Sequence, residues 1–89
     1  MKSFRSPNFK KLFLNLPLEI KRLAYKNYIL WKNNHLYPSI RYKDIGNNLR
    51  SVRIGDHYRA IGTVDADVII WFWIGTHEEY NKIIKGLLK

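Results

Sequence analysis

The spacing of apolar residues divides the chain into a helical first half and a strand-rich second half. In the first half, apolar side chains recur every three or four positions, as on one face of a helix. They are Ile20, Leu23, Ala24, Tyr28 and Trp31. Ser6-Pro7 is typical of a helix start and predicts a first helix that ends near Leu16. Pro17 begins the second helix, and Asn33-Asn34 ends it before Pro38, so we expect a helical hairpin.

The second half consists of short segments rich in β-forming residues, separated by turn residues. The segments are Ile40–Ile45, Leu49–Ile54, His57–Val64 and Asp67–Ile74. Their short connections contain Gly, Asn and Asp, which predicts antiparallel hairpins. The run Val68–Ile74 is apolar at every position, so we expect an interior strand covered on both faces.

A helix start follows the last strand directly. After Gly75, the segment Thr76 to Glu79 matches a capping box, in which threonine and glutamate satisfy each other's backbone amides. Apolar residues then return at helical spacing. They are Tyr80, Ile83, Ile84 and Leu87. The pattern therefore predicts a short C-terminal helix, and the whole chain, residues 1–89, is expected to form one α+β domain.

The connection around Gly55-Asp56 determines which side chains share a face of the sheet. A two-residue loop would pair Ile54 with His57, whereas a three-residue loop pairs Ile54 with Tyr58. The second register separates polar from apolar residues much better, so we adopt it. Its apolar face holds Val52, Ile54, Tyr58, Ala60, Gly62 and Val64, and its polar face holds Ser51, Arg53, Arg59 and Thr63. We expect the helical hairpin to cover the apolar face.

The same alternation predicts a basic surface on the polar face. If the strand Ile40–Ile45 is in phase with its neighbour, Arg41 and Lys43 face away from Ile40 and Tyr42, and Lys43 joins Arg53 and Arg59. Clustered cations can hold a backbone phosphate and stabilise charge that develops on it, and guanidinium does so through two hydrogen bonds. Each arginine taken alone is equally consistent with a surface ion pair.

Net charge also suggests a polyanionic partner. The chain has 89 residues, with 16 Lys and Arg against 7 Asp and Glu, which gives a net charge of +9. Such a surplus on a small domain attracts nucleic acid or an acidic protein, although it also simply favours solubility. The absence of cysteine excludes disulfides and thiolate metal sites and suits a cytoplasmic protein. The longest apolar run is far shorter than the roughly 20 residues of a membrane helix.

His77 is the candidate for proton chemistry, because imidazole titrates near neutral pH. It follows the interior strand, at a helix start whose backbone amides can bind an anion. Tyr80 lies one turn further on, where a core position beside Ile83 is the more ordinary role. The three histidines lack metal-ligand spacing, so neither a metal nor a cofactor is expected. The sequence also lacks a Gly-rich phosphate loop and a Ser nucleophile motif.

Several of these motifs together resemble the RelE/ParE superfamily of toxins from type II toxin–antitoxin modules. The likeness covers nearly the whole chain. It rests on the order of elements and on four segments: Pro38 to Lys43, Ser51 to Ile54, Tyr58 to Ala60 and Trp73 to Tyr80. The resemblance implies an N-terminal helical hairpin packed on a curved antiparallel sheet with a short C-terminal helix. It also implies an antitoxin that wraps the toxin.

The RelE branch of the superfamily cuts mRNA in the ribosome, with basic residues in place of the usual acid–base pair. By this resemblance, Arg59 contacts the scissile phosphate, His77 protonates the leaving group and Tyr80 approximates a terminal tyrosine, at a shorter spacing. The strand lysines of the branch have no clear match. Arg50 and Arg53 are the substitutes, and Arg53 fits the facing better. The catalytic candidates are thus Arg53, Arg59, His77 and Tyr80, and the RNA-binding candidates are Arg41, Lys43, Arg50 and Arg53.

Two alternatives remain open at this point. The ParE branch of the superfamily has the same fold but poisons DNA gyrase by binding it, without RNA chemistry. A domain that only binds nucleic acid or a protein partner is the third possibility. The ribosome with its mRNA, DNA gyrase and an antitoxin are therefore the candidate partners.

Overall fold

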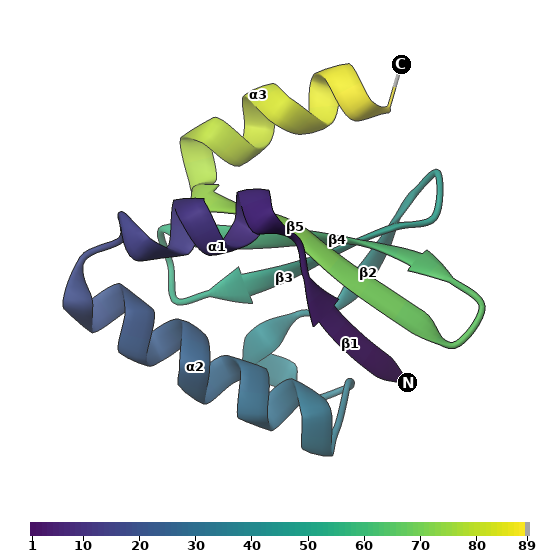
Figure 1. The fold of residues 1–89 in the computed structure, drawn as a ribbon, viewed down its shortest axis with the longest axis horizontal. Coiled ribbons are helices and arrows are strands. Elements are labelled where there is room, and N and C mark those ends of the chain that lie inside the picture. The colour runs from purple at the N-terminus through teal and green to yellow at the C-terminus, as the bar shows by residue number, and fades with distance from the viewer. Residues whose placement is uncertain (89) are drawn as a thin grey trace.

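A single five-stranded sheet organises the computed structural model, which describes residues 1–88. The elements in chain order are β1 (Lys2–Arg5), α1 (Pro7–Leu14), α2 (Leu18–Asn33), a 3₁₀ turn (Pro38–Ile40), β2 (Lys43–Gly46), β3 (Leu49–Ile54), β4 (Tyr58–Asp65), β5 (Val68–Thr76) and α3 (His77–Leu87). The strand order is β1-β5-β4-β3-β2. Helices α2 and α3 lie on opposite sides of the sheet (Figure 1). The expected α+β fold class, with a helical hairpin, a sheet and a closing helix, is confirmed.

Local signals define both ends of the helical hairpin. The Ser6 hydroxyl accepts a hydrogen bond from the Phe9 amide at 3.1 Å, and Pro7 occupies the first position of α1. Helix α1 ends at Leu14, two residues earlier than predicted, because residues that precede a proline such as Pro17 avoid helical geometry. Helix α2 ends at Asn33, as the polar pair indicated.

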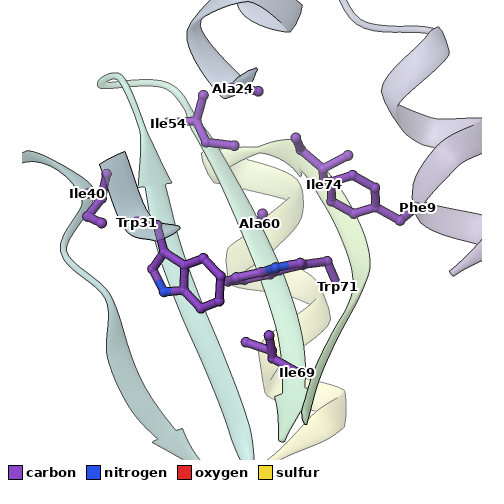
Figure 2. Packing of buried hydrophobic residues seen from close by; sticks show 9 residues of the cluster. All are labelled: Phe9, Ala24, Trp31, Ile40, Ile54, Ala60, Ile69, Trp71 and Ile74. Atoms are coloured by element: carbon purple, nitrogen blue, oxygen red, sulfur yellow. The ribbon is translucent and has the colours of Figure 1, made fainter. Parts of the chain in front are cut away.

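The main core fills the space between the helical hairpin and one face of the sheet. Trp31 of α2 meets Trp71 of β5 edge-on, with ring centroids 5.4 Å apart. Figure 2 shows these rings with their neighbours from both helices and the 3₁₀ turn. The buried cluster is Phe9, Ala24, Trp31, Ile40, Ile54, Ala60, Ile69, Trp71 and Ile74. Ile54, Ala60 and Val52 belong to the predicted apolar face, so the hairpin covers the face that was expected.

A second, smaller cluster lies on the other face, under α3. Leu49, Ile61 and Trp73 pack there against Tyr80 of α3. This face was expected to carry only polar residues, because Leu49, Ile61 and the aromatic residues of β5 had not been assigned to either face. The face is therefore divided, with an apolar part under α3 beside the basic residues.

Strand β1 was not predicted. It pairs in parallel with β5, with Ser3 opposite Ile69 and Phe4 opposite Ile70, and makes the sheet mixed. This pairing is what places β5 inside the sheet, between β1 and β4. The expectation of an interior last strand is thus confirmed, although the neighbour responsible for it comes from the other end of the chain. The expected cover on both faces is incomplete, because Ile70 is 40% exposed.

The predicted strand Ile40–Ile45 is wrong in its first half. Pro38 begins a 3₁₀ turn, and Arg41 adopts the left-handed conformation with φ of 44°, which no strand residue adopts. Tyr42 instead packs its ring edge against Trp31 at 5.7 Å. Strand β2 begins only at Lys43, which pairs with Ser51, so Lys43 faces the same way as Arg53.

Gly75 provides a direct test of how β5 packs beneath α3. A Cβ atom added at Gly75 would lie 2.6 Å from Cζ2 of Trp73, closer than any real contact. We expect Gly75→Ala to lower the free energy of unfolding by about 1–3 kcal/mol, because the indole must move out of a filled site. Chemical denaturation of the variant measures this loss.

Gly86→Ala is the matched control. Apart from its chain neighbours and the backbone of α3 itself, no atom of the described residues lies within 4 Å of a Cβ at Gly86. We expect this substitution to be neutral or to stabilise by up to about 1 kcal/mol, since alanine favours a helix. Equal losses in the two variants would contradict the packing described for Gly75.

Candidate anion-binding site

Two arginines face each other across the β3–β4 hairpin. Arg53 pairs with Arg59, and Ile54 pairs with Tyr58, so the connection contains three residues as predicted. Both arginines lie on the sheet face that carries α3, because they alternate with the residues that contact the helical hairpin. Lys43 shares that face through its pairing with Ser51. The expected co-facing of Lys43, Arg53 and Arg59 is therefore confirmed.

The hairpin turn holds both guanidinium groups. Nε of Arg53 donates to the carbonyl oxygen of Gly55 at 3.2 Å, and its Nη2 lies 3.3 Å from Oδ1 of Asp56. Nη1 of Arg59 donates to the carbonyl oxygens of Tyr58 at 2.7 Å and of Gly55 at 3.4 Å. The carbonyl of Gly55 thus accepts from both arginines and brings them together at one end of the hairpin.

Helix α2 fixes this turn from the opposite side of the sheet. The amide of Asn27, a buried polar side chain, donates to the backbone carbonyl of Arg53 at 3.1 Å. Gly55 has φ of 62°, and a Cβ atom there would lie 2.8 Å from Cδ2 of Leu23. Glycine is the residue that tolerates both the conformation and the close approach. The turn is therefore clamped between α2 and the two arginines.

Burial and neighbouring charges affect the pKa of Arg59. Partial burial lowers the pKa of its guanidinium, and the charge of Arg53 lowers that pKa further. Tyr80 and Asp56 lie close enough to raise the pKa, and Arg41 acts in the same direction as Arg53. Like charges in a partly desolvated place favour the binding of an anion.

His77 begins α3 directly beside this cluster in the sheet. Gly75 pairs with Arg59, and the backbone N–H of His77 donates to the carbonyl oxygen of His57 at 2.7 Å. The side chain of His77 is exposed. An exposed imidazole at this place is accessible to a ligand that approaches the arginines.

The expectation that the start of α3 offers free amides to an anion fails for Thr76, His77 and Glu79, whose backbone N–H groups already have partners within the chain. Oε1 of Glu79 accepts from the backbone N–H of Thr76 at 3.0 Å and from its hydroxyl at 2.9 Å. The Glu79 amide donates to the Thr76 hydroxyl at 3.2 Å. The capping box that the sequence predicted supplies the anion itself, and the His77 amide is used by the sheet.

Tyr80 is a core residue with a charged neighbour. Its side chain is only 6% exposed and contacts Trp73, with ring centroids 6.4 Å apart. It nevertheless lies near enough to Arg59 to influence the pKa of that group. The ordinary core role that the spacing indicated is confirmed.

Arg50 lies apart from the arginine pair. It alternates with Arg53 along β3 and so faces the other side of the sheet, where its Nη1 is 3.3 Å from Oδ1 of Asp44. Burial raises the pKa of the neighbouring Tyr42 hydroxyl, and the charge of Arg50 opposes that rise. The structure therefore brings together Arg53 and Arg59, places Lys43 on the same face and leaves Arg50 out, while Arg41 is exposed and lies outside the strands.

Sequence reasoning missed two residues that shape this site. Asp56 was interpreted only as a turn residue, and Asn27 was given no role. Asn27 carried a weak signal, because it occurs on the face marked by Ala24, Tyr28 and Trp31, where a polar residue needs a partner. Within residues 1–88, no group of three or more His, Asp or Glu residues is placed to hold a metal ion.

Comparison with known proteins identifies the family. The sequence profile of the ParE-like toxin domain matches residues 18–82 of this chain, well over half of its length. The chain therefore belongs to the ParE-like toxin domain family, within the RelE/ParE superfamily of toxins. No curated protein sequence matches it at a significant level. Among its helices in residues 1–88, none is long and apolar enough to span a membrane.

Solved structures share the fold at low sequence identity. The toxin in the RelB–RelE antitoxin–toxin complex from Methanococcus jannaschii is 19% identical, with a TM-score of 0.71, and the match covers 90% of this chain and 96% of that one. The isolated Escherichia coli RelE toxin is 16% identical, with a TM-score of 0.65 and 97% of both chains covered. A copper-bound mutant toxin from Helicobacter pylori is 21% identical, with a TM-score of 0.60, covering 89% of this chain and 97% of that one.

The capping box makes the stability of α3 depend on pH. Hydrogen bonds from the backbone and side chain of Thr76 lower the pKa of Glu79. A carboxylate with a lowered pKa stabilises the fold above its unfolded pKa of about 4.3, and this contribution is lost as the pH falls through its folded pKa. We expect Glu79→Gln to reduce the loss of stability between about pH 5 and pH 3, measured by thermal unfolding.

Glu78→Gln removes the same charge from the same turn and leaves the capping box intact. We expect this control to retain the acid-dependent loss of the parent chain. A Glu79→Gln variant with an unchanged pH profile would show that the capping carboxylate does not stabilise the folded chain.

Proposed function

We propose that this chain is the toxin of a type II toxin–antitoxin module and that it cleaves mRNA on the ribosome. The carrying observation is the pairing of Arg53 with Arg59, both hydrogen-bonded to the carbonyl of Gly55, with Lys43 on the same face and the exposed His77 nearby in the sheet. Like charges held close together on one face are stabilised by a polyanion that satisfies several cations together. A nucleic-acid backbone has this character.

The proposed chemistry uses the RNA's own nucleophile. The ribose 2′-hydroxyl loses its proton to water as its oxygen attacks the adjacent phosphorus, and the bond from phosphorus to the 5′-oxygen breaks to leave a 2′,3′-cyclic phosphate. Negative charge builds up on the non-bridging oxygens during this step. Arg59 and Arg53 stabilise that charge through directed N–H groups. His77 donates a proton to the departing 5′-oxygen, a transfer that a positioned imidazole accelerates. Tyr80, which is buried, holds Arg59 in place, and Lys43 and Arg41 bind neighbouring phosphates.

An antitoxin is the proposed protein partner. The toxins of Methanococcus jannaschii, Pyrococcus horikoshii and Mycobacterium tuberculosis that share this fold were solved as complexes with antitoxins. The charge of this chain, +9, suits an acidic partner segment. Such a segment would occupy the same arginines that bind RNA and would thereby inhibit the toxin.

Inhibition of DNA gyrase is the second candidate function. Its support is that Arg53 and Arg59 are both engaged by the hairpin turn, and that Tyr80 is buried. A protein that acts by binding alone needs no free catalytic groups. In this case the basic face binds gyrase, and growth arrest comes with DNA breaks.

The ribonuclease hypothesis makes a prediction in cells. We expect induced wild-type protein to arrest growth and to produce in-frame cuts in translated mRNA, mapped as new transcript 5′ ends. Arg59→Ala and His77→Ala should each reduce cleavage at least about 100-fold, because they remove phosphate stabilisation and proton donation, respectively.

Lys26→Ala is the control, since it removes one positive charge from an exposed position on α2, outside the arginine cluster. It should retain arrest and cleavage. Arrest with DNA breaks and no mRNA cuts, unchanged in His77→Ala, would contradict the ribonuclease and support gyrase inhibition. No arrest from any variant would leave a binding domain without toxic activity.

A further inference from the structure

Asp56 is a carboxylate inside a site that otherwise suits anions. Its Oδ1 lies 3.3 Å from Nη2 of Arg53, so it occupies a position that a phosphate oxygen would take. Among the carboxylates of residues 1–88, it is the one that pairs with an arginine of the cluster. It also acts on Arg59, whose pKa it raises.

The conformation of the turn places Asp56 next to Arg53. Asp56 follows Gly55, whose left-handed conformation and contact with Leu23 fix the direction of the chain. Asn27 holds the carbonyl of Arg53 on the other side. Asp56 and Arg53 are therefore kept together by elements that do not depend on their own attraction.

The ion pair between Asp56 and Arg53 can be replaced by a pair between Arg53 and another anion at little cost in stability. The side chain of Asp56 is 82% exposed and that of Arg53 is 31% exposed. Exposed ion pairs contribute little to stability, because water and salt screen them. Arg59 donates only to the backbone carbonyls of Tyr58 and Gly55, which cannot leave the turn. Arg53 also donates from Nε to the carbonyl of Gly55, but its Nη2 is engaged by Asp56. An incoming phosphate thus meets Arg59, held by the backbone alone, and Arg53, whose Nη2 is engaged by a replaceable carboxylate.

We propose that Asp56 is an internal competitor for phosphate: it neutralises Arg53 in the free protein and must be displaced when RNA binds. This proposal rests on the proposed RNA-binding function. Asp56 weakens the binding of any single phosphate and so favours a ligand with several phosphates, which contacts Arg53, Arg59 and Lys43 together. It thereby sets the affinity and selectivity of the site through Arg53, without contacting the reacting atoms.

Removal of the competing charge tests this role. We expect Asp56→Asn to bind a short fluorescein-labelled single-stranded RNA about three- to tenfold more tightly at low salt, measured by fluorescence anisotropy. In an Arg53→Gln background, Asp56→Asn should have less than about half of that effect on the logarithm of Kd, because the pair is then already broken. Thermal unfolding checks that all variants remain folded.

Asp44→Asn is the matched control for net charge. Asp44 is also an exposed partner of an arginine, Arg50, but it lies toward the opposite face of the sheet. We expect this variant to bind the RNA as the wild type does. Equal tightening in Asp44→Asn and Asp56→Asn would reduce the effect to net charge and overturn the proposal, as would unchanged binding in Asp56→Asn.

A second ligand distinguishes competition by Asp56 from RNA binding. Titration with inorganic pyrophosphate, followed through the side-chain Nε–H resonances of Arg53 and Arg59, reports on the site without RNA. Tighter pyrophosphate binding in Asp56→Asn, without RNA binding in any variant, would support the competitor and refute the RNA function. RNA binding that is equal in wild type and Asp56→Asn would support the function and refute the competitor.

Discussion

The register of the β3–β4 hairpin is the constraint on which the rest of the structure depends. Three connecting residues place Ile54 opposite Tyr58 and Arg53 opposite Arg59. A slip of one residue would send the arginines into the main core and the apolar residues to the other face. Gly55 makes this turn possible, because it adopts a positive φ while lying against Leu23. The same turn then accepts hydrogen bonds from both guanidinium groups.

Stability and the proposed function share one face of the sheet. Leu49, Ile61 and Trp73 pack beneath α3, and the arginines lie on the same face at the end of the hairpin. Helix α3 is fixed at its first turn by the capping box, and near its end by a hydrogen bond from the Asn47 amide to the carbonyl of Leu87. Both ends of α3 are thus held, and Tyr80 remains beside Arg59.

Local sequence signals predicted the elements that depend on neighbours in the chain. The caps at Ser6 and Thr76 and the β3–β4 register each depend on a few adjacent residues, so the pattern predicted them correctly. Strand β1 depends instead on β5, whose partner residues lie far along the chain, and four residues rich in charge give no periodic signal. Arg41 was misplaced because its left-handed conformation comes from the turn that packs Ile40 into the core.

The sequence predicted which basic residues share a face of the sheet, but not which residues hold them in place. The alternation along β2, β3 and β4 predicts that Lys43, Arg53 and Arg59 share a face, as they do in the structure, which places Arg50 on the other face. The role of Asn27 requires knowing that α2 crosses the end of β3, which no spacing within α2 reveals. The buried position of Tyr80 was, in contrast, indicated by its helical spacing from Ile83.

The central claim is that the face carrying Arg53, Arg59 and Lys43 binds the RNA backbone. The most direct measurement is a chemical-shift map of the protein with a 2′-deoxy or 2′-O-methyl RNA analogue that cannot be cleaved. The account predicts that the largest perturbations occur at Lys43, Arg53, Arg59 and His77, and that the exposed residues of α2 are unaffected. Perturbations centred on α2 or on Arg50, with the arginine pair unchanged, would contradict it.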